Sequence, residues 1–108
     1  SSSRVSENQG LYALSKSCID VMTKYLAIEL CNQNINVNAI APGLIKTNMS
    51  KNVWTDKALL ESIVNNIPDK RIGIPKDISN IVMFLTSSKA KWIKGQTIIA
   101  DGGASLTH

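Results

Sequence analysis

The sequence predicts an α/β fold with parallel strands. A helical pattern of apolar residues covers 11–32, and a short connection leads from it to a β-branched run at 35–41. A second helical pattern, from Pro75 to Ser88, likewise precedes a strand-like run at 95–103. A helix joined to a strand by a short connection is typical of the second half of a β-α-β unit, so both pairs favour an α/β sheet.

The composition suits one small intracellular domain. The chain has 108 residues, of which 44% are hydrophobic, and this fraction argues against disorder. It has no apolar run near about 18 residues and no signal-peptide pattern, so we expect no membrane span. Cys18 and Cys31 fall among apolar neighbours and are interpreted as reduced core thiols. We therefore expect an intracellular protein, with the cytoplasm, the peroxisome and the mitochondrion all open.

The charge pattern does not favour nucleic acid as a partner. The net charge is +4, but the basic residues are scattered along the chain. The tightest basic group surrounds Trp92 and lacks interleaved aromatic side chains, so we predict a solvated turn there. No cluster with metal-ligand spacing is present either, and we expect no metal site.

The first third of the chain predicts a loop and then a long helix. Residues 1–10 are polar and turn-like, which indicates a loop. The apolar arc of 11–32 is wider than a one-sided surface helix needs, so this helix could pack on a sheet with one side and on a partner subunit with another. The amides of 32–34 end it.

The strand predicted at 35–41 is stopped by Pro42 and Gly43. In open parallel sheets ligands bind beyond the carboxyl ends of strands, which places 42–47 where a cofactor would sit. Gly43 would let a planar ring approach the backbone closely, or it would simply serve a strand-ending turn.

The rest of the chain predicts an excursion, a helix and a second strand. The segment 47–68 contains a short helix at 57–66, and its Met49 and Trp54 suit either a lid over an apolar substrate or plain packing. Pro75 is placed for the first turn of the next helix, where Asp77 complements the helix dipole. The end of the chain, 104–108, is predicted to be a short polar tail.

Tyr12 and Lys16 are the candidate acid/base pair. They are four residues apart in the helical pattern, so both lie on one face of the helix. An ammonium beside a phenol favours the phenolate and lowers the phenol pKa, and a shift of about three units takes roughly 4 kcal/mol. Such a tyrosine could exchange a proton with an alcohol or carbonyl oxygen. The spacing alone is a weak signal, because many amphipathic helices carry it.

Several further features, which follow one another in a fixed order, make the functional interpretation of Tyr12 and Lys16 more specific. Serines precede Tyr12-x-x-x-Lys16, and a strand ends in Asn38-Ala-Ile-Ala-Pro-Gly43 with Thr47 four residues on. Arg71-x-Gly-x-Pro-x-Asp77 and Gly95-x-x-x-x-x-Asp101-Gly-Gly follow. Together they strongly resemble the C-terminal half of the short-chain dehydrogenase/reductase family. Within it, the run 41–47 with Ser50, Lys51 and Trp54 looks most like the NADP-dependent carbonyl and retinal reductases.

The resemblance implies roles for the residues before the first strand. Tyr12 would be the catalytic acid/base, and Lys16 would lower its pKa and hydrogen-bond the nicotinamide ribose. Tyr12 and Lys16 would both be cofactor-binding residues as well. A serine among the first three residues would hydrogen-bond the substrate oxygen, with Ser3 preferred and Ser2 as the alternative.

The resemblance implies a cofactor site after the strand. The backbone at Ile45 and the hydroxyl of Thr47 would hold the nicotinamide carboxamide beside Pro42 and Gly43. The cofactor would be NADP, with NAD possible.

For the whole chain, the resemblance implies the C-terminal portion of a Rossmann-like doubly wound parallel sheet, with the N-terminal dinucleotide-binding half absent from residues 1–108. We expect this stretch alone to bind no dinucleotide and to be inactive. The whole protein would interconvert a carbonyl (ketone, aldehyde or retinal) and an alcohol, as a homo-oligomer, dimer or tetramer, through helix 11–32. The alternative is a catalytically silent relative that acts as an interaction subunit.

Overall fold

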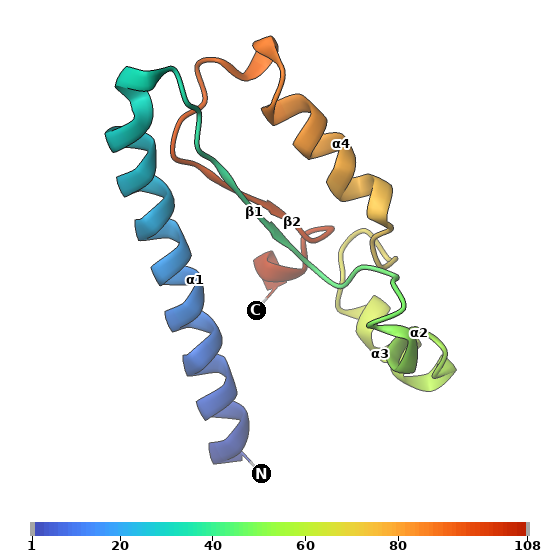
Figure 1. The fold of residues 1–108 in the computed structure, drawn as a ribbon. Helices are drawn as coiled ribbons and strands as arrows, with labels where there is room; N and C mark the ends of the chain where they lie inside the picture. The colour runs from blue at the N-terminus through green and yellow to red at the C-terminus, as the bar shows by residue number, and fades with distance from the viewer. Residues whose placement is uncertain (1, 108) are drawn as a thin grey trace. The chain divides into compact units, whose positions relative to one another are not determined.

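The computed structural model describes the backbone of residues 2–107. Side chains and their burial are described for residues 13–107. It contains helices and two short strands in the alternating order expected of an α/β fold (Figure 1). The helices are α1 (Ser2–Leu30), α2 (Lys51–Trp54), α3 (Lys57–Asn65) and α4 (Pro75–Leu85). The strands are β1 (Ala39–Pro42) and β2 (Thr97–Ala100), and 3-10 turns occupy Cys31–Gln33, Ser88–Ala90 and Ala104–Thr107.

The described chain divides into two compact units. The first unit is the chain up to Ala39 together with Lys91–Thr97, and the second is Ile40–Ala90 together with the chain from Ile98 onward. None of the helices in residues 2–107 combines the length and apolar character needed to cross a bilayer.

Helix α1 confirms the predicted helix and corrects the predicted loop before it. The helix begins at Ser2, so the loop expected at 1–10 is wrong. These residues include no proline, and once a helix is nucleated each further residue adds a hydrogen bond, so polar side chains alone do not end it. At the other end the helix tightens into a 3-10 turn, and Asn34 adopts a left-handed conformation with φ of 59°.

The first unit packs the loop before β2 against one stripe of α1. Thr23 and Ala27 are buried on this stripe, and Lys16 and Asp20 are half-buried. A Cβ built on Gly95 would lie 3.2 Å from the Cβ of Ala27, and Gly95 has a φ of +67°. Only glycine satisfies both the close contact and the left-handed backbone without strain.

The two cysteines do not lie in a core. Both Cys18 and Cys31 are free thiols and exposed. They lie off the stripe that packs in the first unit, so the predicted core position is wrong for the described residues. Large apolar side chains of α1 are also exposed, among them Val21, Met22 and Ile28.

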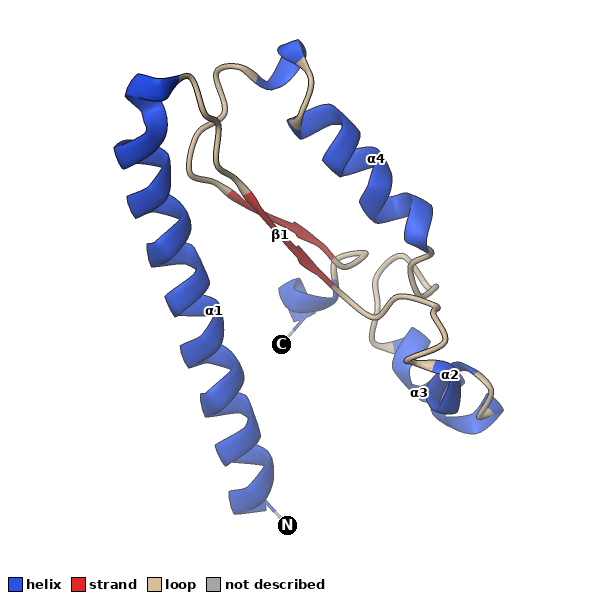
Figure 2. Ribbon diagram, viewed as in Figure 1, coloured by secondary structure: helices blue, strands red, loops and turns tan. Residues whose placement is uncertain are grey.

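The strands pair in a two-stranded parallel sheet (Figure 2). The N–H of Ala39 donates to the carbonyl of Gln96 at 2.8 Å, and the N–H of Gly43 donates to the carbonyl of Ala100 at 2.9 Å. The pairing therefore keeps the same register at both ends of the strands. Both strands were predicted, but each is shorter than expected. Directly before β1, the side-chain amide of Asn38 joins the two segments in place of main-chain pairing. It accepts a hydrogen bond from Gln96 N–H and donates one to Ile93 C=O.

The segment between the strands contains three helices, of which two were predicted. Helix α3 begins after Asp56, whose carboxylate accepts from Leu59 N–H at 3.1 Å. Helix α4 begins at Pro75 as expected, and Asp77 accepts from the N–H of Ile74 at 2.8 Å. The short helix α2 was not predicted.

The turns near the end of the chain give one confirmed prediction and one correction. Trp92 is 97% exposed, which confirms a solvated turn around it. The tail expected at 104–108 is instead a 3-10 turn over Ala104–Thr107, because the carboxylate of Asp101 accepts hydrogen bonds from the main chain of this turn.

Candidate functional site

Tyr12 and Lys16 lie on α1, in the first unit. The helix runs unbroken through both residues, so they are separated by about one turn and share a face. Lys16 is half-buried. The side chain of Tyr12 lies outside the described side chains, so the contact between phenol and ammonium stays a prediction.

Ser3 also lies on α1. It precedes Tyr12 by nine residues, which corresponds to about 13 to 14 Å along the axis of a continuous helix. Its side chain, like that of Ser2, lies outside the described residues. The assignment of Ser3 to the substrate oxygen stays a prediction.

The predicted cofactor residues lie on one continuous segment of the second unit. Pro42 ends β1, and Gly43 follows it beside the end of β2. A Cβ built on Gly43 would lie 2.7 Å from the Cβ and 2.8 Å from the Cα of Asp101. The structural reason for glycine at this position is therefore the neighbouring backbone at Asp101.

The backbone at Ile45 is held from one side by Gly73. Gly73 N–H donates to Leu44 C=O and Lys46 N–H donates to Gly73 C=O, both at 2.9 Å, in an isolated parallel bridge. The hydroxyl of Ser50 donates to Ile45 C=O at 2.6 Å. Among the described residues no group accepts from Ile45 N–H. Of the four main-chain polar groups in the two peptides around Ile45, this N–H is the one without a partner among the described residues.

Thr47 is held by two residues that the sequence analysis did not assign to the site. Its N–H donates to Ser50 Oγ at 3.0 Å, and its carbonyl accepts from the indole Nε1 of Trp54 at 2.8 Å. Lys46 Nζ lies 4.7 Å from the centroid of the Trp54 ring, within range of a cation–π interaction. Serine hydroxyls often bond to main-chain groups a few residues away in turns, and this is the property of Ser50 that could have indicated the arrangement.

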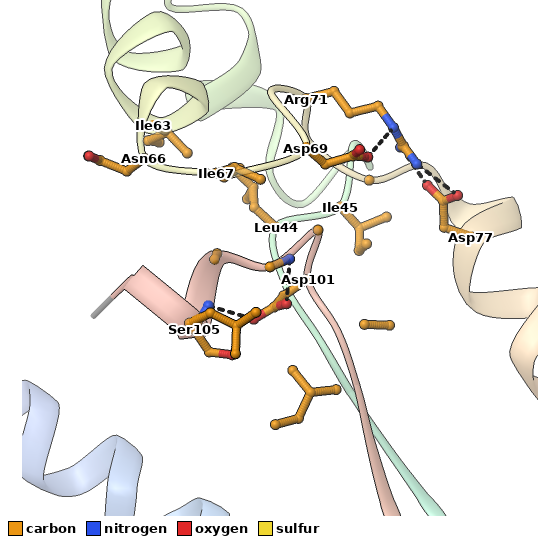
Figure 3. A pocket seen from close by; sticks show the side chains of 17 residues that line it. Leu44, Ile45, Ile63, Asn66, Ile67, Asp69, Arg71, Asp77, Asp101 and Ser105 are labelled. Carbon is orange, nitrogen blue, oxygen red and sulfur yellow. Dashed lines mark hydrogen bonds and ion pairs between the residues drawn. The ribbon is translucent and has the colours of Figure 1, made fainter.

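A cavity of about 660 Å³ lies in the second unit (Figure 3). Its lining is mainly apolar and includes Ile45, Ile67 and Ile99. Of the predicted site residues only Ile45 lines it. Its charged side chains are paired with other groups, so the cavity offers no unpartnered charge to a ligand.

Arg71 is the centre of those pairs. Its guanidinium lies 3.0 Å from a carboxylate oxygen of Asp69 and 2.8 Å from one of Asp77, as Figure 3 shows. The hydrogen bond with Arg71 and that with Ile74 N–H lower the pKa of Asp77. The same hydrogen bond with Asp77 raises the pKa of Arg71. Since Asp77 lies in the first turn of α4, its pair with Arg71 connects the turn at 69–74 to the start of that helix.

Asp101 caps the last turn of the described chain. Its carboxylate accepts from Ser105 N–H at 2.9 Å and from Gly103 N–H at 3.0 Å. These bonds hold the pKa of Asp101 below its ordinary value, with the bond from Ser105 contributing most.

Asp101 should therefore contribute a pH-dependent part of the stability. Because its folded pKa is depressed, its contribution is present above the unfolded pKa of about 3.9 and is lost as the pH falls through the folded pKa. We expect the free energy of unfolding of the full-length protein to fall more steeply between about pH 5 and pH 3 than that of an Asp101→Asn variant. Urea denaturation at a series of pH values would measure this.

The exposed carboxyl of Glu61 on α3 provides a control. Glu61→Gln should leave the pH dependence close to that of the unmodified protein. Parallel curves for the unmodified protein and Asp101→Asn would contradict the role given to Asp101.

No group of three or more His, Cys, Asp or Glu side chains that could hold a metal occurs in the part of the chain the structure describes.

Comparison with known proteins extends over nearly the whole chain. A family model described as Enoyl-(Acyl carrier protein) reductase matches residues 1–105. Dehydrogenase/reductase SDR family member 4 of Oryctolagus cuniculus is 47% identical over 95 residues, which cover 88% of this chain and 36% of that protein. The chain thus spans about a third of the length of this relative.

Two solved structures have a similar fold. A protein from Agrobacterium tumefaciens solved with bound NADP has a TM-score of 0.79 and 38% identity, over 88% of this chain and 39% of that one. A 4-hydroxyisoleucine dehydrogenase complexed with NADH has a TM-score of 0.83 and 35% identity, over 90% of this chain and 40% of that one. The fold is thus that of the C-terminal part of a Rossmann-like sheet, as predicted, and the chain belongs to the short-chain dehydrogenase/reductase family.

Proposed function

We propose that the protein containing this chain is an NADP(H)-dependent oxidoreductase that interconverts a carbonyl and an alcohol. The observation that carries the proposal is the unbroken helix α1 through Tyr12 and Lys16 in a member of this family. Tyr12 exchanges a proton with the substrate oxygen, and Lys16, one turn away, stabilises the phenolate.

The segment after β1 fits a nicotinamide carboxamide. A primary amide has one carbonyl acceptor and one NH₂ donor. Ile45 N–H, which no described group engages, would donate to the carbonyl, and the Thr47 hydroxyl would accept from the NH₂ group. Pro42 and Gly43 lie just before them at the carboxyl end of β1, where open parallel sheets bind their ligands. A nicotinamide cofactor, when bound, supplies or accepts the hydride.

The choice of NADP over NAD is part of the proposal. The two solved relatives carry NADP in one case and NADH in the other, and this supports a nicotinamide cofactor of either kind. Assays with both reduced cofactors are therefore needed.

The test is cofactor oxidation by the full-length protein. NADPH and NADH would each be supplied with a diketone, an aldehyde or retinal. The rate would be followed by the loss of the absorbance of the reduced nicotinamide. We expect oxidation that depends on the carbonyl substrate and on Tyr12. A full-length protein that oxidises neither cofactor with any of these substrates would favour the alternative of a silent interaction subunit.

We also propose that the protein is a homo-oligomer, a dimer or a tetramer, through helix 11–32. Support comes from the apolar side chains that this helix leaves exposed, for example Tyr25 at 65% and Ile28 at 79%. Tyr25 and Ile28 are three residues apart and so lie on one face of the helix, and exposed apolar patches are typical of interaction sites.

A further inference from the structure

We propose that Ser50 and Trp54 are positioning residues that hold Ile45 and Thr47 in the geometry that binds the nicotinamide carboxamide. The inference rests on the proposed function, and it assigns to these two side chains a part in cofactor affinity without contact with the reacting atoms.

The hydroxyl of Ser50 connects the two binding positions. The Ser50 hydroxyl donates its proton to the carbonyl of Ile45 at 2.6 Å, which is the shortest of its contacts. Thr47 N–H donates to Ser50 Oγ at 3.0 Å. Since a serine hydroxyl has one proton, Ser50 then has only a lone pair to offer Thr47 Oγ1, which lies 3.4 Å away. Within this arrangement a hydrogen bond between the two hydroxyls has Thr47 Oγ1 as its donor, which leaves the lone pairs of Thr47 Oγ1 available to accept from a carboxamide NH₂ group.

Ser50 also helps to hold the backbone next to the other half of the carboxamide site. Leu44 C=O and Lys46 N–H are both taken by Gly73. With Ile45 C=O taken by Ser50, three of the four polar groups in the two peptides flanking Ile45 are fixed. Gly73 holds the peptide that carries Ile45 N–H through Leu44 C=O, and it holds the next peptide through Lys46 N–H. Ser50 adds a second bond to that next peptide through Ile45 C=O, and so limits the rotation of the backbone on the C-terminal side of Ile45.

Trp54 holds the same turn from helix α2. Its indole N–H donates to Thr47 C=O at 2.8 Å, and its ring lies under Lys46 Nζ at 4.7 Å from the centroid. The residues on both sides of the Lys46–Thr47 peptide are thus bound to one half-buried side chain. Since α2 begins one residue after Ser50, the two positioning residues act from the same short helix and its start.

The first test compares three serine variants of the full-length protein. Ser50→Ala removes the shared hydroxyl, and we expect the Kd and KM for the nicotinamide nucleotide to rise about fivefold to tenfold, as for the loss of one or two hydrogen bonds. Ser50→Thr keeps a hydroxyl and is tolerated where a helix begins, so it should restore most of the affinity. Ser79→Ala is the matched control, because the Ser79 hydroxyl on α4 donates to the Lys76 carbonyl outside this turn.

The second test uses the two tryptophans. Trp54→Phe keeps an aromatic ring under Lys46 but removes the indole N–H, and we expect a rise of about threefold to fivefold in the Kd for the nucleotide. Trp92→Phe changes a side chain that is 97% exposed and should leave the Kd unchanged.

The measurements separate this inference from the proposed function. Nucleotide Kd, the KM for the carbonyl substrate and the melting temperature would be measured for every variant. A rise in nucleotide Kd and KM in Ser50→Ala and Trp54→Phe, with little change in the KM for the carbonyl substrate and with rescue by Ser50→Thr, supports the inference. Unchanged nucleotide Kd in Ser50→Ala, or equal effects in Ser50→Ala and Ser79→Ala, overturns it while the proposed function stands. Failure of the unmodified protein to bind either nucleotide overturns both.

Discussion

Replacement of Tyr12 by phenylalanine is expected to lower kcat by about 10²-fold to 10⁴-fold, the usual contribution of a positioned acid or base. The aromatic ring is kept and only the phenolic hydroxyl is lost, so the main effect should be on kcat. The measurement is steady-state cofactor oxidation by the full-length protein with a diketone or retinal.

A second tyrosine on the same helix provides the control. Tyr25 is 65% exposed and lies more than three turns beyond Tyr12, so Tyr25→Phe should leave kcat unchanged. Equal rates for the unmodified protein and Tyr12→Phe would refute the acid/base role.

The effect of Lys16 should appear in the pH profile. An ammonium one turn away favours the phenolate, so its removal in Lys16→Met should raise the pKa that governs the tyrosine. The alkaline shift would be read from the pH at which the rate is half-maximal. An unshifted profile in Lys16→Met would indicate that the two groups do not interact.

Replacement of Gly43 by alanine is expected to lower the free energy of unfolding by about 1 to 3 kcal/mol, the usual cost of overpacking. The added Cβ would lie 2.7 Å from the Cβ and 2.8 Å from the Cα of Asp101. Both atoms are held close to the main chain directly after β2, so the backbone segments at the ends of the two strands would have to move apart. Urea denaturation of the full-length protein would measure the loss.

Gly73 offers a matched comparison in the same unit. A Cβ there would lie 2.6 Å from Ile45 Cδ1, which is the far end of a flexible side chain. Rotation of Ile45 can relieve this contact, so Gly73→Ala should cost clearly less than Gly43→Ala. The reverse order would show that the approach of Gly43 to Asp101 is not tightly packed.

Regular elements with a strong local signal were predictable. Helix α1 between 11 and 30 and helix α4 from Pro75 follow from apolar spacing and from a proline suited to a first helical turn. The two strands were found because β-branched runs ended at glycines or at Pro42. Their bounds were too wide, since a run of β-branched residues does not show where a partner strand ends.

The errors arose where local signals were weak. Residues 2–10 are helical although their composition is typical of a turn, and α2 has only four residues, too few for a periodic pattern. Cys18 and Cys31 were assigned to a core because of their neighbours in sequence, but burial depends on which face of a helix is covered.

Residue order and residue type were enough to establish the α/β class, the main helices and the family, together with Tyr12, Lys16 and Thr47 as candidates. These depend on spacing along the chain, which a sequence contains directly. The contacts of Gly43 with Asp101 and of Leu44 and Lys46 with Gly73 became visible only in three dimensions. They join segments far apart in the chain, and their geometry depends on the path of everything between them. For the same reason the part played by Ser50 and Trp54 emerged from hydrogen bonds, which residue identity alone does not reveal.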